Sequence, residues 1–493
     1  MSEKGINIRE SGAVGDGKTV CTDIINAALR EASESGIGRV VVPPGVFVCG
    51  TIQLQSNITL EITTGATLLA SPNFEDFSEI PLEEAESRHH DHSGRCFILA
   101  NKCENVTICG GGIIDGNNEV YANPPREKRG PNHQWFGYRK ESYQPTVELR
   151  KTNNIRLLDI TIQNGVRWNV HLFRCERVWV ERVCILNDPY AGNSDGFDID
   201  GCRDVFISNT KIDTGDDAIV LKTLVDSQSC ERITVTNCVL KSTCAAFKIG
   251  TESWHDFRHI TFSDSVVHQS SRAFEIVVFD GGNVEDVTVS GLVVDTNIGV
   301  TMTRPLHIDC AKRRAGYNPL PERTEYALGR VRRVSFSDIT ISTDGRILLT
   351  AADGTCLDQI SLRNIQVHMP WIEDPRAVDK LSDGMQSSNG SPEARLARAA
   401  IVAKDIKNLL IDGFSISYPE RPVGEDYMPK IEKREVVRDP REEFEPMPDF
   451  NVFYGRNIEG GYVNLKGARP SGKDVAVLDV EDCDVTIECD GKN

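Results

Sequence analysis

Three aspartates in two short segments carry the strongest chemical signal of this sequence. They belong to Asn193-Ser-Asp195 and to Gly215-Asp216-Asp217. Hydrolysis of a glycosidic bond needs one carboxylic acid that protonates the leaving oxygen and one carboxylate that activates water or attacks the sugar. Neighbouring like charges raise the pKa of one carboxyl group and leave another ionised, so an acid and a base can coexist at one pH. We therefore predict acid/base catalysis, with turn-stabilising aspartates or a calcium site as the alternatives.

Four segments that align residue for residue predict the strands that position these carboxyl groups: 195–200, 217–222, 245–250 and 272–277. Each has large apolar residues at alternate positions, as strands with one buried face require. The predicted inward stacks are Phe197, Ile219, Phe247 and Phe274, and Ile199, Leu221, Ile249 and Ile276. The outward columns are Asp195, Asp217, Ala245 and Arg272, and Asp198, Val220, Lys248 and Glu275. Because neighbouring strands lie about 4.8 Å apart, we expect Asp195 and Asp217 almost on top of each other.

A repeated phrase predicts how these strands are organised along the chain. Glu176-Arg-Val-Trp-Val, Arg203-Asp-Val-Phe-Ile and Glu231-Arg-Ile-Thr-Val are three examples of it, and most intervals are roughly 23 to 28 residues. Short strands at this period, with asparagine, aspartate or glycine at the bends, predict an all-β fold, a right-handed single-stranded parallel β-helix. An amphipathic helix over residues 23–33 is expected to cap its N-terminal end.

We expect a single domain over residues 1–493, interrupted by two polar or proline-rich insertions near 371–395 and 419–450. Such insertions are usually surface loops; a rim of the binding cleft or an oligomer contact is the alternative.

Composition limits the partners and the location. The formal net charge of −18 argues against nucleic acid, which needs a basic face. No stretch approaches the roughly 18 apolar residues of a membrane span. The start, Met-Ser-Glu-Lys-Gly-Ile-Asn-Ile-Arg, has no apolar stretch behind a basic flank, so we expect a cytoplasmic protein. The fifteen cysteines are odd in number and irregularly spaced, which predicts reduced thiols rather than disulfides.

The two aspartate segments, read at full length, resemble a known family. Asn-Ser-Asp-Gly-Phe-Asp-Ile-Asp-Gly-Cys-Arg-Asp-Val at 193–205 and Asp-Thr-Gly-Asp-Asp-Ala-Ile-Val-Leu-Lys at 213–222 are similar to glycoside hydrolase family 28, the polygalacturonases and their pectin-degrading relatives. Gly12-Ala-Val-Gly-Asp-Gly-Lys and Gly250-Thr-Glu-Ser are similar too, so the resemblance covers roughly residues 5–370. It implies a right-handed parallel β-helix of the pectin-lyase type.

The resemblance also implies roles for the three aspartates. Hydrolysis would invert the anomeric centre, with Asp216 as the general acid and with Asp195 and Asp217 holding and deprotonating the water. Two departures bear on the substrate. Where the family has Gly-His-Gly this chain has Cys244-Ala245-Ala246, so the family's histidine is absent, and the family's Arg-Ile-Lys, which grips a substrate carboxylate, is matched by Arg272-Ala-Phe-Glu-Ile-Val. The expected substrate is therefore an oligosaccharide other than plain polygalacturonate.

Further substrate-binding candidates lie on or beside the same columns. The predicted set is Asn193, Trp168, His171, Asp198, Lys248, Glu252 and Arg272. Trp168 and His171 suit ring stacking and a hydroxyl contact, with a histidine satisfied in the cleft wall as the alternative. Lys248 could compensate for the missing histidine, with an ion pair to Glu275 on the next coil as the alternative.

Two other groups of basic residues stand out in the sequence. Arg304, His307, Arg313 and Arg314 lie in an apparent insertion that could overhang the cleft, although a solvated loop is the preferred interpretation. The run Arg88-His89-His90-Asp91-His92 is a poor metal candidate, because adjacent loop histidines without partners define no tetrahedral or facial site. The remaining interpretations of this run are a loop that contacts the substrate and an ordinary surface loop. We expect neither a metal nor a cofactor.

The sequence thus predicts a glycosidase that hydrolyses O-glycosyl bonds in pectin-type oligosaccharides containing uronic acid or rhamnose. A cytoplasmic location would favour exo-action on short oligosaccharides. One alternative is a uronate-polymer lyase or epimerase, which needs a base for a carbon-bound proton and a cation to neutralise the carboxylate. Another is a non-catalytic carbohydrate-binding β-helix. The sugar, the linkage and homo-oligomer formation stay open.

Overall fold

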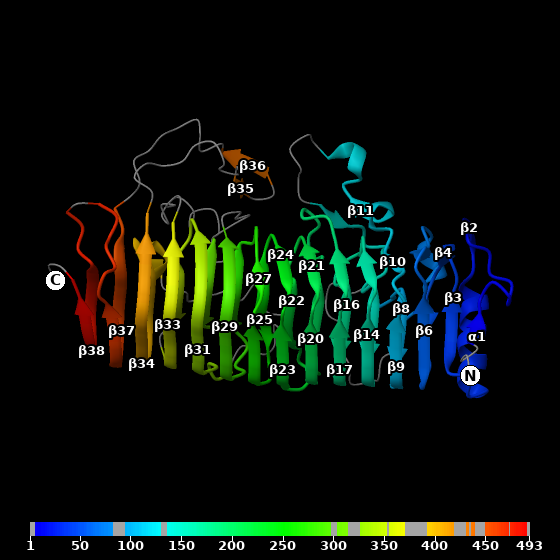
Figure 1. The fold of residues 1–493 in the computed structure, drawn as a ribbon, viewed down its shortest axis with the longest axis horizontal. Coiled ribbons are helices and arrows are strands. Elements are labelled where there is room, and N and C mark those ends of the chain that lie inside the picture. The colour runs from blue at the N-terminus through cyan, green and yellow to red at the C-terminus, as the bar shows by residue number, and fades with distance from the viewer. Residues whose placement is uncertain are drawn as a thin grey trace. The chain divides into compact units, whose positions relative to one another are not determined.

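A computed structural model describes the chain except for residues 1–4, 82–93, 130–135, 297–302, 314–325, 353, 370–391, 419–429, 433–434, 439–448, 473 and 491–493. It divides into two compact units, Met1–Val239 and Leu240–Asn493. In each unit, parallel strands of successive coils lie side by side in long ladders (Figure 1). The expectation of a single domain stays a prediction.

The first unit has three ladders of parallel strands. The first comprises β1 (Ile6–Asn7), β3 (Arg39–Val42), β6 (Ile58–Ile62), β9 (Glu104–Cys109), β14 (Asn153–Leu158), β17 (Glu176–Glu181), β20 (Arg203–Ser208) and β23 (Cys230–Thr236). The second comprises β2 (Asp16–Val20), β4 (Gly45–Cys49), β7 (Ala66–Ala70), β10 (Ile113–Asp115), β15 (Thr161–Gln163), β18 (Cys184–Leu186) and β21 (Lys211–Thr214). The third comprises β5 (Ile52–Gln53), β8 (Ile98–Asn101), β13 (Val147–Arg150), β16 (Val170–Phe173), β19 (Phe197–Asp200) and β22 (Ile219–Thr223). One turn of solenoid thus contributes one strand to each ladder.

The second unit has the same kind of architecture, with longer strands. One ladder contains β26 (Phe257–Ser263), β29 (Val284–Thr296), β31 (Val331–Thr343), β33 (Leu357–His368), β34 (Ala399–Ser417), β37 (Asn451–Leu465) and β38 (Leu478–Cys489). Another contains β25 (Ala245–Ser253), β28 (Arg272–Val278), β30 (Arg304–Cys310) and β32 (Ile347–Ala351), which pairs with the start of β34. β24 (Val239–Ser242) and β27 (Val266–Val267) are short.

Minor elements decorate both units. They are the 3-10 helices η1 (Phe74–Asp76), η2 (Asn118–Val120) and η3 (Arg126–Lys128), the antiparallel pairs β11 (Ala122–Asn123) with β12 (Gly137–Tyr138) and β35 (Lys430–Glu432) with β36 (Glu435–Arg438), and helix α3 (Pro392–Leu396). Most of the two predicted insertions and the whole histidine run at 89–92 lie outside the described residues.

Helix α1 (Thr22–Glu34) occupies the place of the predicted N-terminal cap (Figure 1). Its buried residues Ile25, Ala28, Leu29 and Ala32 follow the i, i+3, i+4, i+7 spacing of one helix face. That face packs against strands β3, β5 and β6. The helix therefore packs on the first strands of the solenoid, and the predicted N-terminal cap is confirmed.

The inward stacks form as predicted within each unit. Phe197 pairs with Ile219 in the β19–β22 register, and Ile199 pairs with Leu221. In the second unit the rings of Phe247 and Phe274 stack with their centroids 5.4 Å apart. All of these side chains are buried. The period-two pattern therefore identified the core correctly.

All fifteen cysteines are free, and most of them are buried in the turns or the core. No helix among the described residues is long and apolar enough to cross a membrane.

Candidate active site

The turns that precede β19 and β22 carry the three predicted catalytic aspartates. The N–H of Gly196 donates to the carbonyl of Asp217 at 2.9 Å, which joins the two turns in the register that the sequence predicts. Asn169 holds the first turn, because its Nδ2 donates to the carbonyl of Asp195 at 2.7 Å. Asn187 Nδ2 donates to the carbonyl of Ser194 at 3.2 Å. The backbone N–H of Asn169 also donates to the carbonyl of Asp195, at 2.9 Å, so the side-chain amide adds to a ladder bond there.

Asp216 is the most accessible carboxyl group of the three, and its orientation is set by the backbone. Its Oδ2 accepts the N–H of Asn193 at 3.1 Å, and its Oδ1 accepts the N–H of Asp217 at 2.9 Å. Asp216 is half-buried, whereas Asp195 and Asp217 are only 2% exposed. Oxygens of Asp216 and Asp217 lie within 4.8 Å of each other. The three aspartates therefore converge, and Asn193 contributes its backbone rather than its exposed side chain.

The electrostatics of this cluster favour a retained proton. Burial raises the pKa of Asp195 well above its usual range, and the neighbouring carboxylates of Asp198 and Asp216 raise it further. The ammonium group of Lys222 opposes this rise. A carboxyl group with a raised pKa keeps its proton to a higher pH than an exposed aspartate does. Because these carboxyl groups repel one another when ionised, the cluster favours an arrangement in which they share a proton, as an acid/base pair does.

Asp198 lies in the predicted outward column, but it is completely buried. Lys222 Nζ is 3.6 Å from its Oδ1, and neither carboxylate oxygen has a hydrogen-bond partner in the described part of the chain. Burial raises the pKa of Asp198 to about 8, although Lys222 and His171 act against the rise. At Asp198 the outward column is therefore a buried polar position rather than solvent-facing surface.

His171 and Trp168 form the wall beside this column. His171 Nδ1 lies 2.8 Å from Glu148 Oε2, and its Nε2 lies 3.6 Å from Asp200 Oδ2. Burial by itself lowers the pKa of this imidazole, but the carboxylates of Glu148 and Asp200 outweigh burial and raise it to about 10. The Trp168 ring meets the His171 ring edge-on at 5.1 Å. Both side chains are at most 5% exposed, so this wall contains an imidazolium locked between two acids.

Sequence reasoning missed the residues that complete this wall. Glu148, Arg150, Asp200 and Lys222 are all buried. Glu148 Oε1 accepts a hydrogen bond from Arg150 Nη1 at 2.9 Å, and Lys222 Nζ lies 4.7 Å from the centre of the Trp168 ring. The sequence feature that could have identified them is the alternation of charged with apolar residues in Val-Glu-Leu-Arg at 147–150 and at the end of the 217–222 segment.

In the second unit, Glu275 contacts several of the basic residues that the sequence analysis named as candidates. Lys248 Nζ lies 3.8 Å from Glu275 Oε2, and Arg272 Nε lies 3.1 Å from Oε1. His307 Nδ1 is 2.7 Å from Oε1, and Arg304 Nη1 is 2.9 Å from His307 Nε2. Burial opposes ionisation of Glu275, yet Arg272, His307 and Lys248 hold its pKa far below its usual range. The ion pair of Lys248 with Glu275 is therefore present.

The expectation of a solvated loop is wrong for three of the four residues to which it was applied. Arg304 and His307 belong to β30, which pairs with β28, and they are 7% and 3% exposed. Arg313 is also buried; its Nε and Nη2 donate to the two oxygens of Asp280 at 2.6 Å, and its Nη1 lies 3.7 Å from Glu252 Oε1. The charged residues of this segment led to the prediction of a loop, although the segment includes the regular strand β30. Arg314 lies outside the described residues.

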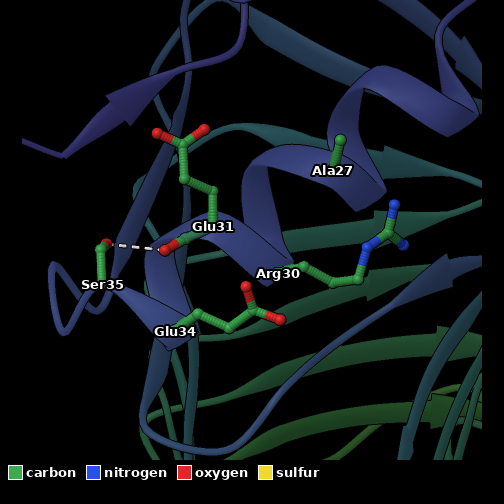
Figure 2. Close-up of a pocket in the computed structure, with 5 residues that line it drawn as sticks. All are labelled: Ala27, Arg30, Glu31, Glu34 and Ser35. Atoms are coloured by element: carbon green, nitrogen blue, oxygen red, sulfur yellow. Dashed lines mark hydrogen bonds between the residues drawn. The ribbon is translucent and has the colours of Figure 1, made fainter.

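The surface of helix α1 also carries a hollow (Figure 2). Ala27, Arg30, Glu31, Glu34 and Ser35 line it. Ser35 Oγ donates to the carbonyl of Glu31 at 2.6 Å, which closes the end of the helix. None of the predicted site residues lines this hollow, so the chemistry is assigned to the β19–β22 turns.

Comparison with known proteins agrees with this assignment. The model of the glycosyl hydrolases family 28 matches residues 32–369, which include the three aspartates. A probable polygalacturonase from Vitis vinifera is 26% identical over 302 residues, which cover 58% of this chain and 60% of that protein. An exo-poly-alpha-D-galacturonosidase from Dickeya chrysanthemi is 30% identical over 255 residues, 44% of this chain and 41% of that protein. The chain thus spans only about half the length of these two relatives.

Solved structures with the same fold extend over most of the chain. The family 28 exopolygalacturonase of Yersinia enterocolitica superposes with a TM-score of 0.65 at 15% identity, covering 85% of this chain and 77% of that one. The exopolygalacturonase of Thermotoga maritima superposes with a TM-score of 0.60 at 20% identity, covering 84% and 93%. At these identities the comparison shows the fold alone, and the predicted right-handed parallel β-helix is confirmed.

Proposed function

We propose, from the premise that this chain belongs to the glycosyl hydrolases family 28, that it hydrolyses a glycosidic bond in a pectin-type oligosaccharide containing uronic acid or rhamnose. The observation that carries the proposal is the convergence of Asp195, Asp216 and Asp217 on two adjoining turns, with a buried carboxyl group whose pKa is raised. A family member with such a cluster has the acid and the base that hydrolysis requires.

Accessibility supports a division of roles among the three aspartates. Asp216 is the most exposed of them, and the N–H groups of Asn193 and Asp217 fix both of its oxygens. In the proposed mechanism its protonated form delivers a proton to the departing glycosidic oxygen. Asp195 and Asp217 hold the water from behind, and one of them takes its proton as the water attacks the anomeric carbon. Attack from the face opposite the leaving group inverts that carbon.

Three cations of the second unit are the proposed contacts for a uronate carboxylate. Lys248, Arg272 and Arg304 come from the neighbouring strands β25, β28 and β30, and all converge on Glu275 or on its partner His307. Glu275 holds the cations in one place. A substrate carboxylate that approached them would form charge-assisted hydrogen bonds, which are stronger than neutral ones. Glu252, held near Arg313, remains a proposed contact for sugar hydroxyls.

Product analysis tests the proposal directly. The chain is incubated with defined galacturonate and rhamnogalacturonan oligosaccharides, and the configuration of the first-formed reducing sugar is followed by NMR. The expected result is cleavage with an inverted product and no ultraviolet absorbance from an unsaturated sugar. Unsaturated products would establish a lyase instead. Absence of cleavage across the whole panel would leave only a carbohydrate-binding protein.

Exo-action and a cytoplasmic location remain part of the proposal. Time courses on long polymer separate the modes of action, since exo-action releases short products while the viscosity falls slowly. Fractionation of the source cells tests the location. Rapid loss of viscosity, or recovery outside the cytoplasm, would contradict the respective prediction.

A further inference from the structure

Two aromatic side chains lie next to each other on the outer face of the first ladder of the first unit. Trp179 of β17 pairs in register with Phe206 of β20. Their rings stack with centroids 5.8 Å apart and an interplanar angle of 18°. The guanidinium carbon of Arg156, one coil earlier on β14, lies 5.1 Å from the centre of the Trp179 ring. Arg156, Trp179 and Phe206 are called the aromatic strip below.

The aromatic strip is not part of the core. Phe206 is 40% exposed and is the one aromatic among the exposed large apolar side chains of the described residues, and Trp179 is partly exposed. The same column carries Thr107 on the preceding coil and Thr234 on the following coil, residues that suit a solvent-facing strand position. Two stacked rings at consecutive coils therefore leave apolar surface in water without supporting the core, which marks an interaction site.

The chemistry of the strip specifies a sugar that carries an acid group. The C–H bonds on one face of a pyranose bear slight positive charge and pack against the negative face of an aromatic ring. The Phe206 ring faces Trp179 on one side, and Arg156 lies over the Trp179 ring, so the 40% exposed Phe206 offers the main apolar contact for a sugar and the rim of Trp179 extends it. Arg156 makes no ion pair with any residue that the structure describes, and its contact is with the Trp179 ring. The indole N–H of Trp179 has no hydrogen-bond acceptor among the described residues. A guanidinium group in this state can take a carboxylate in a two-pronged contact.

We propose that Arg156, Trp179 and Phe206 form a second carbohydrate-binding site, on a different ladder from the three aspartates, that binds a uronate-containing oligosaccharide by packing a sugar on the exposed Phe206 ring and the rim of Trp179 and by pairing one carboxylate with Arg156. The choice of a uronate rests on the proposed function, whereas the stacking contact stands without it. Such a site would hold a polymer on the solenoid while its end is processed elsewhere. The formal charge of −18 sets nucleic acid aside as the stacked ligand.

Affinity electrophoresis of the full-length chain in gels containing polygalacturonate tests the site. The substitution Asp216→Asn is present throughout, so that the polymer is not consumed. Combining Trp179→Ala with Phe206→Ala is expected to weaken retention about tenfold or more, as truncation of aromatic anchors does at binding sites. Trp179→Phe keeps an aromatic face and should restore most of the retention. Val266→Ala, at a 41% exposed apolar position of the second unit, is the matched control and should leave retention unchanged.

A second variant tests the acid-specific part. Arg156→Gln should weaken retention by polygalacturonate, and weaken it less at high salt, while retention by its fully methyl-esterified form stays the same. Equal retention of the double alanine variant and its parent would overturn the site, provided that their circular dichroism and Tm agree. Equal retention by the acidic, esterified and single-stranded DNA gels would overturn the uronate assignment. Hydrolysis by the unmodified chain is measured separately: strip-dependent retention without hydrolysis would sink the proposed function and leave this site standing.

Discussion

Lys222 Nζ lies 3.6 Å from the Oδ1 atom of Asp198 and 4.7 Å from the centre of the Trp168 ring. The ammonium group is therefore held between a buried acid and an aromatic face. It acts against the rise in the pKa of both Asp195 and Asp198. Lys222 is thus a positioning residue that sets how readily the aspartate cluster ionises.

Replacing Lys222 should shift the pH dependence of hydrolysis. In Lys222→Met the pKa values of Asp195 and Asp198 rise further, because their nearby cation is gone. The limb of kcat/KM that rises with pH should move upward by roughly one pH unit or more. Lys222→Arg should keep most of the native profile. The control is Lys211→Met, which removes a half-exposed lysine that pairs with Asp213 at 3.3 Å. An unchanged pH profile of kcat/KM for Lys222→Met would contradict the proposed role of Lys222 in the ionisation of the aspartates.

Replacing Asp216 should abolish turnover without unfolding the chain. Asp216→Asn keeps the shape of the side chain but removes the proton donor, so kcat should fall by about 10²–10⁴-fold. Initial rates of reducing-sugar release measure this effect. Asp213→Asn, on the neighbouring strand β21, should retain activity. Comparable rates for Asp216→Asn and the native chain would rule out Asp216 as the acid.

Lys248 should affect acidic substrates selectively. Lys248→Met removes one of the cations around Glu275, so KM for a uronate oligosaccharide should rise about tenfold, the factor that corresponds to 1.4 kcal/mol. The methyl-esterified oligosaccharide has no carboxylate to lose, and its KM should stay the same. Lys241→Met, on β24, is the matched control. An equal rise in KM for both substrates would argue for a structural role of Lys248.

The buried pair of His171 and Glu148 should stabilise the fold in a pH-dependent manner. The pKa of His171 is raised to about 10, so its contribution is fully present below the ordinary histidine pKa of about 6.5 and is lost as the pH rises toward 10. His171→Gln leaves Glu148 without its imidazolium and should cost about 3–5 kcal/mol near pH 6. The gap in Tm between native and variant should narrow between pH 7 and 10. The 60% exposed His259 side chain provides the control His259→Gln; a pH-independent gap would contradict an imidazolium at 171.

Acid should destabilise the second unit through Glu275 and His307. The pKa of Glu275 is lowered, so its contribution is present above about pH 4.5 and is lost as the pH falls further. The pKa of His307 is lowered to about 4, so the unfolded chain binds that proton first and stability already declines below about pH 6.5. Glu275→Gln should lower Tm at pH 7 and flatten this acid limb. The exposed pair of Lys407 and Glu459 offers Glu459→Gln as the control, for which Tm should hardly change.

The repeating parts of the fold could be read from the sequence because they depend on local pattern. Alternation with period two identified the stacks of Phe197 with Ile219 and of Phe247 with Phe274, and the helix predicted at 23–33 is α1. The spacing of one coil also brought Asp195 and Asp217 onto adjoining turns. A solenoid makes such inference possible, because each coil contacts mainly its neighbours.

The sequence by itself therefore determined the β-helix, its core stacks and the placement of three aspartates on two adjoining turns. Only the tertiary structure decided which outward charges are buried and which partners they meet. Glu148 reaches His171 across 23 residues, and His307 reaches Glu275 across 32 residues. The physical reason is that alternation tells which face of a strand a side chain occupies, whereas burial of that outer face depends on turns and strands that arrive from elsewhere in the chain.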